Sequence, residues 1–558
     1  GVTGGTFSGL ESIADYCAPG YTPVKSDDGS FTVSFDAGKV FGGGSGTETD
    51  PYQIADETQL AAFRDAVNTG QTFAGQYIVL TANIDITGKE WEPIGTGERS
   101  GSGFAGNSFR GVFDGNDKTI SGLTITSEGT YAGDKAIGLF GVVAGGTVKD
   151  LTLENVKINV SDNELAGGIA GLLCGGGTIS GCEVSGSVSI KDGAGGIVGR
   201  MVVSGTVSDC VNNAAVTCSA GGAAGIVGKA YYTQPNEIMT IENCTNNGNI
   251  TNPQYHAGGI SALCAANVTD CTNNGVITAG NTAGGIVAEQ VNWGTVSGCT
   301  NGGTIKGDNN AGGIIGWVRY QNDTSAYAKS GTIHVLNNTN SAVITTKTES
   351  KPAGGLGWGG IVGTVYNAGY VSGNENTAPS ITGGTFAAGV VGNLQGEESN
   401  LYYGAPDIDV VNNVSTTPLE SITVDGSCKN EYAYNNKADT FVAAENSTAW
   451  AAQIGDQKYT TLQGAIEAAG AMDGNVTVEI IGQADISGLL KDNNTMESFD
   501  LSGSKLTGLT IQGADETARI VSGVDGNDID GDDPNTAGTQ ETDYRCPVIS
   551  IKLPADVT

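Results

Sequence analysis

Short apolar segments recur along most of this chain, separated by Gly, Asn and Ser. One phrase, Ala-Gly-Gly-Ile-Val-Gly at Ala194–Gly199, returns with small variations every 26 to 34 residues, apart from one interval of 47. The apolar residues at the centre of its copies are Leu139, Ile169, Ile197, Ile226, Ile260, Ile286, Ile314, Ile361 and Val390. A regular period of this length predicts a stack of similar units.

Each repeat contains three short segments rich in β-branched residues, such as Ala283–Ala288, Gly294–Cys299 and Gly303–Lys306. None is long enough for an ordinary α-helix, and Gly and Asn supply turns because they adopt a positive φ at little cost. Three strands per repeat, each stacked on its counterpart in the next, predict an all-β fold. This fold is a parallel β-helix with coils about 4.8 Å apart.

Two columns of aligned residues support this stacking. The first column is apolar or thiol, and its members are Leu151, Cys182, Cys210, Cys244, Cys271, Cys299 and Leu336. The second lies two residues later and contains amides, namely Asn212, Asn246, Asn273, Asn301 and Asn338. We expect an internal ladder from the first column and, at a corner, an Asn ladder that bonds coil to coil from the second.

The chain divides into four predicted segments. These are 1–41, the end of a preceding module or a linker; 42–135, an N-terminal α/β cap; 136–435, the β-helix repeats; and 436–558, a smaller C-terminal β-rich module or the start of a second β-helix. A cap is expected because the first coil would otherwise expose unpaired strand edges.

Two helices are predicted outside the repeats. In the N-terminal cap, Asp56 is expected to cap a helix with Gln59 as its capping-box partner. The apolar stripe of that helix is Leu60, Phe63 and Val67, and strands follow near Tyr77–Leu80 and Ile84–Ile86. In the C-terminal module, Thr460 or Thr461 caps a short helix with Leu462, Ala465, Ile466 and Ala469 on one face, before a strand at Val476–Ile481.

The charge balance argues against nucleic acid and against anionic membrane surfaces. Acidic residues outnumber basic ones by 60 to 26, for a net charge of −34, and both of those partners need clustered Lys and Arg. No apolar run reaches the roughly 18 residues of a membrane span. We expect a soluble, monomeric extracellular chain, and its abrupt ends at Gly1 and Thr558 suggest a piece of a longer exported protein.

The cysteines are expected to be reduced, structural thiols. Eleven is an odd number, so at least one thiol lacks a partner within the chain. Neighbouring coils would bring ladder cysteines within disulfide range, which keeps disulfides as the alternative. Buried cysteine also packs as a small hydrophobe, and no Cys-x-x-Cys spacing indicates zinc.

Several motifs ahead of the repeats resemble those of a known family. They are Gly46–Tyr52, Trp91–Gly95, Phe109–Asn116, Ile120–Leu123 and Ile137–Gly141. In this combination, over roughly Gly42 to Asn435, the chain resembles the GLUG-motif surface proteins of gut and oral bacteria. That motif also occurs ahead of the peptidase in some IgA-cleaving metalloproteases. The resemblance implies a right-handed parallel β-helix that is secreted or attached to the wall, and it supplies no catalytic residues.

The enzymatic alternative is a β-helix polysaccharide lyase or glycoside hydrolase. Hydrolysis needs two carboxylates about 5 to 9.5 Å apart across a cleft. Repeat acids such as Asp209, Glu242 and Asp270 are expected in turns, in contact with solvent. The two histidines fit no hydrolase signature, since His256 is predicted at a surface turn and His334 is expected to point outward from a strand.

Two groups of residues are candidate binding sites. An acidic loop with Asp525, Asn527, Asp528, Asp530 and Asp532 offers the oxygen ligands that calcium prefers, against the alternative of a disordered acidic loop. Scarce aromatic residues follow the Gly-Gly-Ile segments of successive repeats, where flat rings beside polar groups suit sugar or protein recognition. This second group consists of Tyr231, Tyr232, Trp293, Trp317, Arg319 and Tyr320.

These observations predict a non-catalytic, extracellular bacterial surface protein. It would act as an adhesin or a rigid presenting stalk that binds host or dietary glycans or proteins. No cofactor is required, and calcium at the acidic loop is the one metal that the sequence suggests. Ordinary packing of the aromatic residues onto the β-helix is the alternative to a ligand surface.

Overall fold

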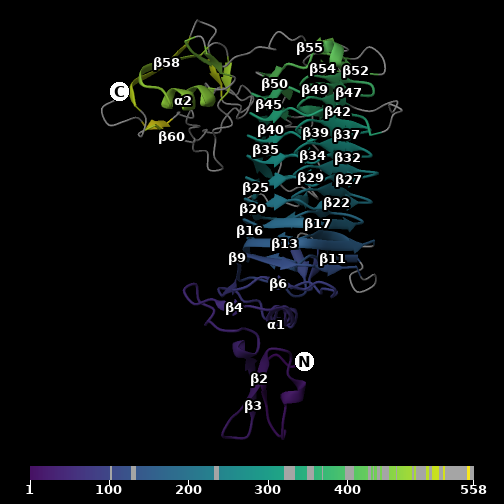
Figure 1. Cartoon of the computed structure of the whole chain (residues 1–558), viewed down its shortest axis with the longest axis vertical. Helices are drawn as coiled ribbons and strands as arrows, with labels where there is room; N and C mark the ends of the chain where they lie inside the picture. Colours follow the sequence, from purple (N-terminus) through teal and green to yellow (C-terminus); the bar gives the residue numbers. More distant parts are fainter. Residues whose placement is uncertain are drawn as a thin grey trace, which may run out of the picture.

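The computed structural model describes residues 1–100, 103–126, 133–161, 163–231, 238–319, 333–347, 357–366, 369–395, 408–411, 413–424, 429–430, 433–435, 440–442, 452–455, 457–459, 462–480, 483–485, 498–501, 505–513, 519–521 and 550–552. Most of these residues form a parallel β-solenoid of about 11 turns (Figure 1). Within the described ranges, the strands of the coils make sheets of 29, 12 and 11 strands. The predicted all-β parallel fold is confirmed.

From Ala194 onward each full coil has five strands, two more than the repeat pattern predicts. In one coil, β33 (Thr282–Gly284) belongs to the 12-stranded sheet and β34 (Val287–Val291) to the 11-stranded sheet. The 29-stranded sheet receives β35 (Gly294–Ser297), β36 (Thr300–Asn301) and β37 (Ile305–Gly307). The Ala-Gly-Gly-Ile phrase is therefore a corner between two strands.

Glycine is required at this corner because backbones approach closely there. A Cβ on Gly284 would lie 1.8 Å from the Val287 carbonyl oxygen, and one on Gly285 would lie 1.9 Å from the Gly313 carbonyl oxygen. No side chain fits at such distances. The central isoleucine that follows, Ile286 in this coil, points inward and is fully buried. The repeated phrase thus encodes a tight turn plus one core side chain.

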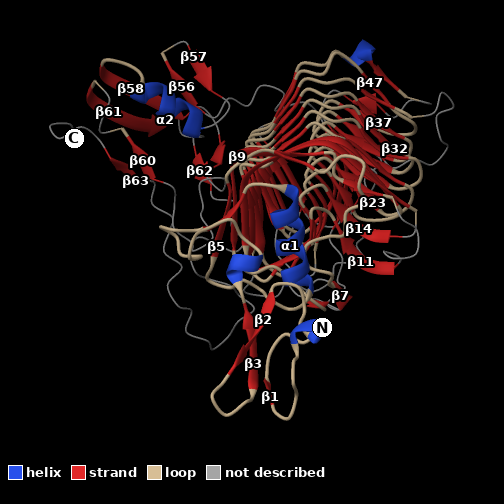
Figure 2. Ribbon diagram, turned by 60° about the horizontal axis from the view of Figure 1, so that its bottom comes forward, coloured by secondary structure: helices blue, strands red, loops and turns tan. Residues whose placement is uncertain are grey.

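Strands of the two smaller sheets follow one another coil by coil. In the 12-stranded sheet they include β18 (Ala194–Gly195), β23 (Gly222–Ala224), β28 (His256–Gly258), β33, β38 (Asn310–Gly312) and β43 (Gly357–Gly359). In the 11-stranded sheet they include β19 (Val198–Val202), β24 (Val227–Ala230), β29 (Ser261–Cys264), β34, β39 (Ile315–Arg319) and β44 (Val362–Tyr366). Figure 2 shows these strands stacked along the length of the solenoid.

The thiol column lies inside the solenoid, as predicted. Cys182, Cys210, Cys244, Cys271 and Cys299 are at most 1% exposed. Their thiols contact backbone carbonyls of their own coil and of the preceding one, as Cys271 does with Thr269 at 3.2 Å and Ile241 at 3.7 Å. All nine cysteines in the described ranges are free, which confirms the expected thiols for that part of the chain.

Beside the thiols runs a buried ladder of asparagine amides. Each Nδ2 donates to the Oδ1 of the next coil at 2.8 or 2.9 Å. The members are Asn212, Asn246, Asn273, Asn301, Asn340 and Asn376, all fully buried. At the far end, Asn376 Nδ2 donates to the hydroxyls of Ser415 and Thr417.

The predicted register is wrong by two residues where the ladder passes Asn301. Strand pairing aligns Asn301 with Asn340, and the Cys299 column continues into Asn338 instead of Leu336. Asn338 starts a second amide ladder, through Asn374 to Asn413 at 2.9 and 2.8 Å. The physical reason is that Leu336 pairs with Ser297 at the end of the preceding strand.

The N-terminal helix closes one end of the solenoid core. Helix α1 (Glu57–Asn68) lies across the first coils (Figure 2), and its apolar face belongs to the same buried cluster as the solenoid interior. Asp56 accepts from the Gln59 backbone N–H, as predicted, but the Gln59 side chain accepts from Ala55 N–H. Strands β4 (Tyr52–Ile54), β5 (Tyr77–Leu80) and β6 (Ile84–Asp85) already belong to the 29-stranded sheet.

Two smaller units flank the solenoid in the sequence. The first residues form a sheet of β1 (Thr6–Phe7), β2 (Tyr21–Lys25) and β3 (Phe31–Phe35). Near the other end, α2 (Leu462–Gly470) buries the four residues predicted for its apolar face. It packs against β56 (Ala452–Ile454), β57 (Gln457–Tyr459), β58 (Gly474–Ile480) and β61 (Leu506–Gly513) around a separate core. None of the described helices has the length and apolarity to cross a membrane.

Replacing Asn273 by Ala should lower the free energy of unfolding by about 2–4 kcal/mol, because it leaves buried partners on both neighbouring coils with one hydrogen bond fewer. The matched control is Asn274→Ala on the next, exposed residue, whose amide donates to Asn247 at 2.9 Å. Urea denaturation should show a change within about 0.5 kcal/mol for the control. Equal losses in the two variants would contradict a stabilising role for the buried ladder.

Burial should protect the interior thiols from alkylation in the native protein. Burial raises the pKa of Cys174 to about 11 and that of Cys264 to about 12, so neither forms the reactive thiolate near neutral pH. With iodoacetamide at pH 8, peptide mass spectrometry should find half-buried Cys17 modified and the other eight described cysteines modified only after denaturation. Rapid labelling of Cys244 in the folded protein would contradict this prediction, because it would show that the reagent reaches the thiol column in the native state.

Candidate functional site

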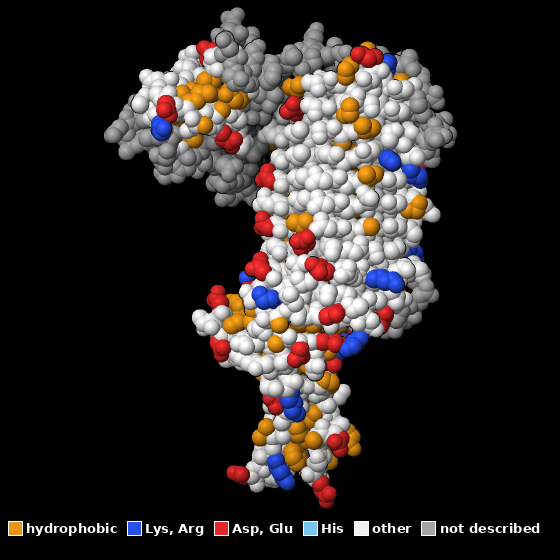
Figure 3. Space-filling model, viewed as in Figure 1, with side chains coloured by type: hydrophobic (Ala, Val, Ile, Leu, Met, Phe, Trp, Pro, Cys, Tyr) orange, Lys and Arg blue, Asp and Glu red, His pale blue; other side chains and the backbone are white. Residues whose placement is uncertain are grey.

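Charged and aromatic side chains gather where the outer face of the 11-stranded sheet meets the 12-stranded sheet. We call this cluster the polar seam, and its members are Asp192, Arg200, Lys229, His256, Glu289, Trp317 and Arg319. On the face of the solenoid drawn in Figure 3, charged side chains are scattered singly or in small groups. In the seam, charged side chains from several coils contact one another.

Strand register places the seam residues coil by coil. One column of the 11-stranded sheet runs Leu172, Arg200, Lys229, Leu263, Glu289, Trp317, Thr364 and Asn393. Two residues further along the strand, Arg319 is the neighbour of Val291. Residues that are 26 to 47 positions apart in the sequence are thereby about 4.8 Å apart along the solenoid.

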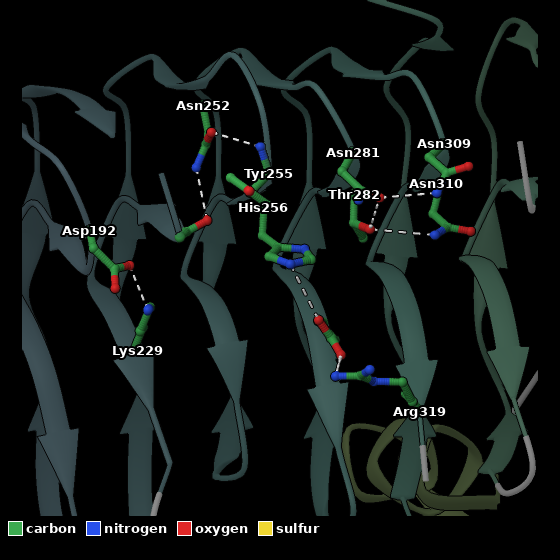
Figure 4. A network of polar contacts seen from close by, with 12 residues as sticks. Asp192, Lys229, Asn252, Tyr255, His256, Asn281, Thr282, Asn309, Asn310 and Arg319 are labelled. Carbon is green, nitrogen blue, oxygen red and sulfur yellow. Dashed lines mark hydrogen bonds and ion pairs between the residues drawn. The ribbon is translucent and has the colours of Figure 1, made fainter. Parts of the chain in front are cut away.

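Glu289 is the centre of the more accessible end of the seam. Its side chain is only 2% exposed and forms an ion pair with the Arg319 guanidinium from the next coil. On its other side, Glu289 Oε2 lies 3.6 Å from His256 Nε2, on the adjacent 12-stranded sheet. Figure 4 shows this chain of contacts from His256 to Arg319. A buried carboxylate needs such partners, because an unpaired charge is costly away from water.

His256 is not the surface turn residue that the sequence suggested. It begins strand β28, and its side chain is 20% exposed. Burial lowers its pKa below the ordinary value of 6.5, and the positive charges of Arg319 and Lys229 act in the same direction. The negative charge of Glu289 opposes this shift. The corner between the two sheets, which the sequence pattern does not reveal, accounts for the difference.

Trp317 and Arg319 add a flat surface with unused donors. The guanidinium carbon of Arg319 lies 4.8 Å from the centre of the Trp317 ring, within the range of a cation–π contact. Both side chains are half-buried. Trp317 Nε1, Arg319 Nε and His256 Nδ1 have no hydrogen-bond partner in the described part of the protein. Trp317 Nε1–H and Arg319 Nε–H can donate to the oxygen atoms of a ligand, whereas His256 Nδ1 is an acceptor when Nε2 carries the imidazole proton toward Glu289.

A second ion pair lies further along the seam. Lys229 Nζ is 2.5 Å from Asp192 Oδ1, and the lysine side chain is 10% exposed. Burial lowers the pKa of Lys229, while the neighbouring Asp192 carboxylate opposes that shift. The pair packs over Gly221, where a Cβ would come within 1.5 Å of Asp192 Oδ1. Glycine at this position thus leaves room for the carboxylate.

Neutral polar side chains hold the rest of the corner together. Thr364 Oγ1 on the 11-stranded sheet is 2.8 Å from Asn310 Oδ1 on the 12-stranded sheet. Asn310 Nδ2 also donates to Thr282 Oγ1 at 3.4 Å, as drawn in Figure 4. At the turn before His256, Asn252 Oδ1 accepts from the Tyr255 backbone N–H at 2.8 Å. These bonds fix the backbone that presents the charged residues.

The structure separates the aromatic residues that the sequence grouped together. Trp317 and Arg319 lie in the seam, whereas Tyr231 and Trp293 are 9% and 5% exposed and pack with Ala265 and Val291 in a small apolar cluster. Tyr231 also lies over the guanidinium of Arg200 in the seam, with its ring centre 4.9 Å from the guanidinium carbon. The two rings offer little exposed surface, and their role in binding stays a prediction. Tyr232 and Tyr320 lie outside the described residues.

The predicted calcium loop, with Asp525, Asn527, Asp528, Asp530 and Asp532, also lies outside the described residues. Where the structure describes the chain, no three His, Cys, Asp or Glu side chains come together in a way that could hold a metal ion. Sequence reasoning missed Asp192, Arg200, Lys229 and Glu289. For Arg200, Lys229 and Glu289 the available signal was their position in aligned repeats, where a charged residue replaces the apolar Leu172 or Leu263 of other coils.

Comparison with known proteins gives partial matches. No family model matches this chain. Over 139 residues, 24% of the chain, it is 37% identical to a protein of Evansella cellulosilytica named as a candidate Gly-rich membrane protein. Over 153 residues, 27% of the chain, it is 28% identical to halomucin of Haloquadratum walsbyi. The matches span only 14% and 2% of those two relatives.

A solved structure also shares features with the chain. The crystal structure of a candidate immunoglobulin A1 protease from Bacteroides ovatus aligns with 72% of this chain and 89% of its own, at 20% identity and a TM-score of 0.33. A likeness of that size supports no conclusion about the activity of this chain.

The lowered pKa of His256 predicts a specific loss of stability in acid. Because the unfolded chain binds a proton near pH 6.5 and the folded chain does so only at lower pH, stability falls as the pH drops below about 6.5. Thermal unfolding from pH 7.5 to 5 should show a smaller fall in Tm for His256→Gln than for the unmodified protein. His334→Gln is the control, and parallel curves for all three proteins would contradict the burial of a neutral imidazole.

Proposed function

We propose that this chain is a non-catalytic, extracellular bacterial surface protein whose solenoid presents a glycan-binding surface at the polar seam. The observation that carries the proposal is the convergence of His256, Glu289, Trp317 and Arg319 from three successive coils and two sheets. Together they offer a flat ring, a fixed guanidinium and unpaired donors. These are the groups that commonly orient a sugar, with its apolar faces and many hydroxyls.

The solenoid suits the role of a stalk. Backbone hydrogen bonds join successive coils, the buried amide ladder adds to them from Asn212 to Asn376, and one core cluster runs from α1 through the coils. A solenoid of this kind extends in one dimension and presents side chains along its length. The seam is therefore held on a rigid support, which limits the entropy lost when a ligand binds.

The pairing of Glu289 supports a binding role over catalysis. Retaining and inverting hydrolases both use two carboxylates beside the scissile bond. Glu289 is engaged by Arg319 and His256, and the other seam carboxylate, Asp192, is engaged by Lys229. A lyase or hydrolase is the alternative, and it would use these same groups as acid or base.

A cell-surface setting is supported by composition and by one relative. The net charge of −34 suits a chain that avoids nucleic acid and anionic lipid. The matched protein of Evansella cellulosilytica is named as a membrane protein. The resemblance to GLUG-motif proteins points to the same location. The matches span a small part of each relative. The cellular location of the whole protein is therefore part of what we propose.

Removing the indole of Trp317 should weaken glycan binding by about tenfold or more, equivalent to about 1.4 kcal/mol. The experiment compares the unmodified protein with Trp317→Ala on a glycan array, and checks the same glycans for cleavage products. Tyr16→Ala is the control, since Tyr16 is an aromatic residue 68% exposed and far from the seam in sequence. Circular dichroism should show that both variants keep their strand content.

Binding without cleavage, lost in Trp317→Ala alone, is the expected result. Cleavage of any bound glycan would contradict the non-catalytic role and favour a lyase or hydrolase. Unchanged binding in Trp317→Ala, or no binding by the unmodified protein, would contradict a glycan surface at the seam.

A further inference from the structure

Arg200 is the one member of the polar seam whose charge the described chain does not balance. Its side chain is among the largest that are fully enclosed, at 2% exposed. In the described part of the protein, neither Nε nor Nη1 has a hydrogen-bond partner. Arg200 also appears in none of the ion pairs found there, although Lys229 and Arg319 each hold a carboxylate.

Among the described residues, the neighbours of Arg200 explain why Nε and Nη1 have no acceptor. Leu172, on the preceding coil, lies beside Arg200 and belongs to an apolar cluster. Lys229, on the following coil, lies on the other side of Arg200. The ring of Tyr231 covers the guanidinium, with its centre 4.9 Å from the guanidinium carbon. The nearby carboxylate of Asp192 already binds Lys229.

This arrangement leaves an excess positive charge at one place in a strongly acidic protein. Arg200 and Lys229 stand on adjacent strands, and among the described residues Asp192 is the one carboxylate paired with either of them. A buried guanidinium without a hydrogen-bond acceptor is destabilising, because it has lost water and contact with the Tyr231 ring replaces only part of that hydration. Buried polar groups in folded proteins nearly always have a partner, and an ion or a ligand is one source of it.

We propose that Arg200 and Lys229 form a binding site for an oxyanion group, covered by Tyr231. A planar guanidinium fork donates two parallel hydrogen bonds to a carboxylate, sulfate or phosphate, and a neighbouring ammonium adds charge. The oxyanion would come from a free inorganic ion or from the acidic group of a saccharide. This inference goes beyond the proposed glycan surface and does not depend on Trp317 or Glu289.

The test measures the thermal stability of the full chain with different anions at constant ionic strength. Sulfate, phosphate and glucuronate are compared with chloride, for the unmodified protein and for Arg200→Met. Sulfate stabilises most proteins by exclusion from their surface, so the variant supplies the baseline for that general effect. We expect an oxyanion to raise the Tm of the unmodified protein by at least about 3 °C more than that of the variant.

In chloride alone, Arg200→Met should be as stable as the unmodified protein or more so, because it removes an unpaired buried charge. Arg200→Lys is the second variant. It keeps the positive charge but loses the planar guanidinium, which donates two parallel hydrogen bonds. It should retain less than half of the anion-dependent shift. Should Arg200→Met fail to fold, this lysine variant and direct calorimetric titration of the unmodified protein with sulfate still decide the result.

Two further ligands distinguish the sources of the anion. A uronate-containing oligosaccharide is compared with its neutral counterpart of the same length. Stabilisation by sulfate and phosphate as well as by the acidic oligosaccharide supports a site for a free ion. Stabilisation by the acidic oligosaccharide alone supports the acidic group of a glycan. Equal Tm shifts in the unmodified protein and in Arg200→Met for every anion would overturn the proposal.

Discussion

The distance of about 4.8 Å between hydrogen-bonded parallel strands governs this protein. Within the paired strands each side chain has its counterpart on the next coil at that distance, so neighbouring residues in a column must tolerate contact with one another. Isoleucine packs on isoleucine in the core, and amides satisfy this condition by bonding to each other at 2.8 Å. Where the column holds Arg200 beside Lys229, the same spacing forces two cations together.

The spacing also explains which parts of the fold the sequence could predict. Repeated Ile, Cys and Asn positions reveal columns directly, because each column obeys the same steric rule in coil after coil. The register near Asn338 was missed because the segment from Leu336 to Asn340 contains three asparagines, which allow more than one alignment. The hydrogen bond from the Cys299 backbone N–H to Asn338 Oδ1 and the pairing of Asn301 with Asn340 fix the alignment. The sequence also did not predict that the Ala-Gly-Gly-Ile phrase contains a corner between two strands. A corner and a continuous strand are equally compatible with a run of small residues.

The candidate site was less predictable than the fold. Trp317 and Arg319 stood out because aromatic and basic residues are scarce. Glu289, His256 and Lys229 did not, since their significance comes from contact across a corner between two sheets. His256 reaches Glu289 from a different sheet and a preceding coil. A sequence shows the columns within a sheet, but it shows neither the angle at which two sheets meet nor which of their outer columns face each other.

The asparagine ladders also have a direction. In the buried ladder every amide from Asn212 to Asn376 donates toward the C-terminal coil, so the amide dipoles align and add together. Outside it, Asn274 donates to Asn247, Asn247 to Asn213 and Asn213 to Glu183, in the opposite sense. The two rows form an antiparallel pair of dipoles whose fields partly cancel. The buried row ends on Ser415 and Thr417, whose hydroxyl groups accept the last N–H bonds and still carry a proton to donate, as Thr417 does to Ala378.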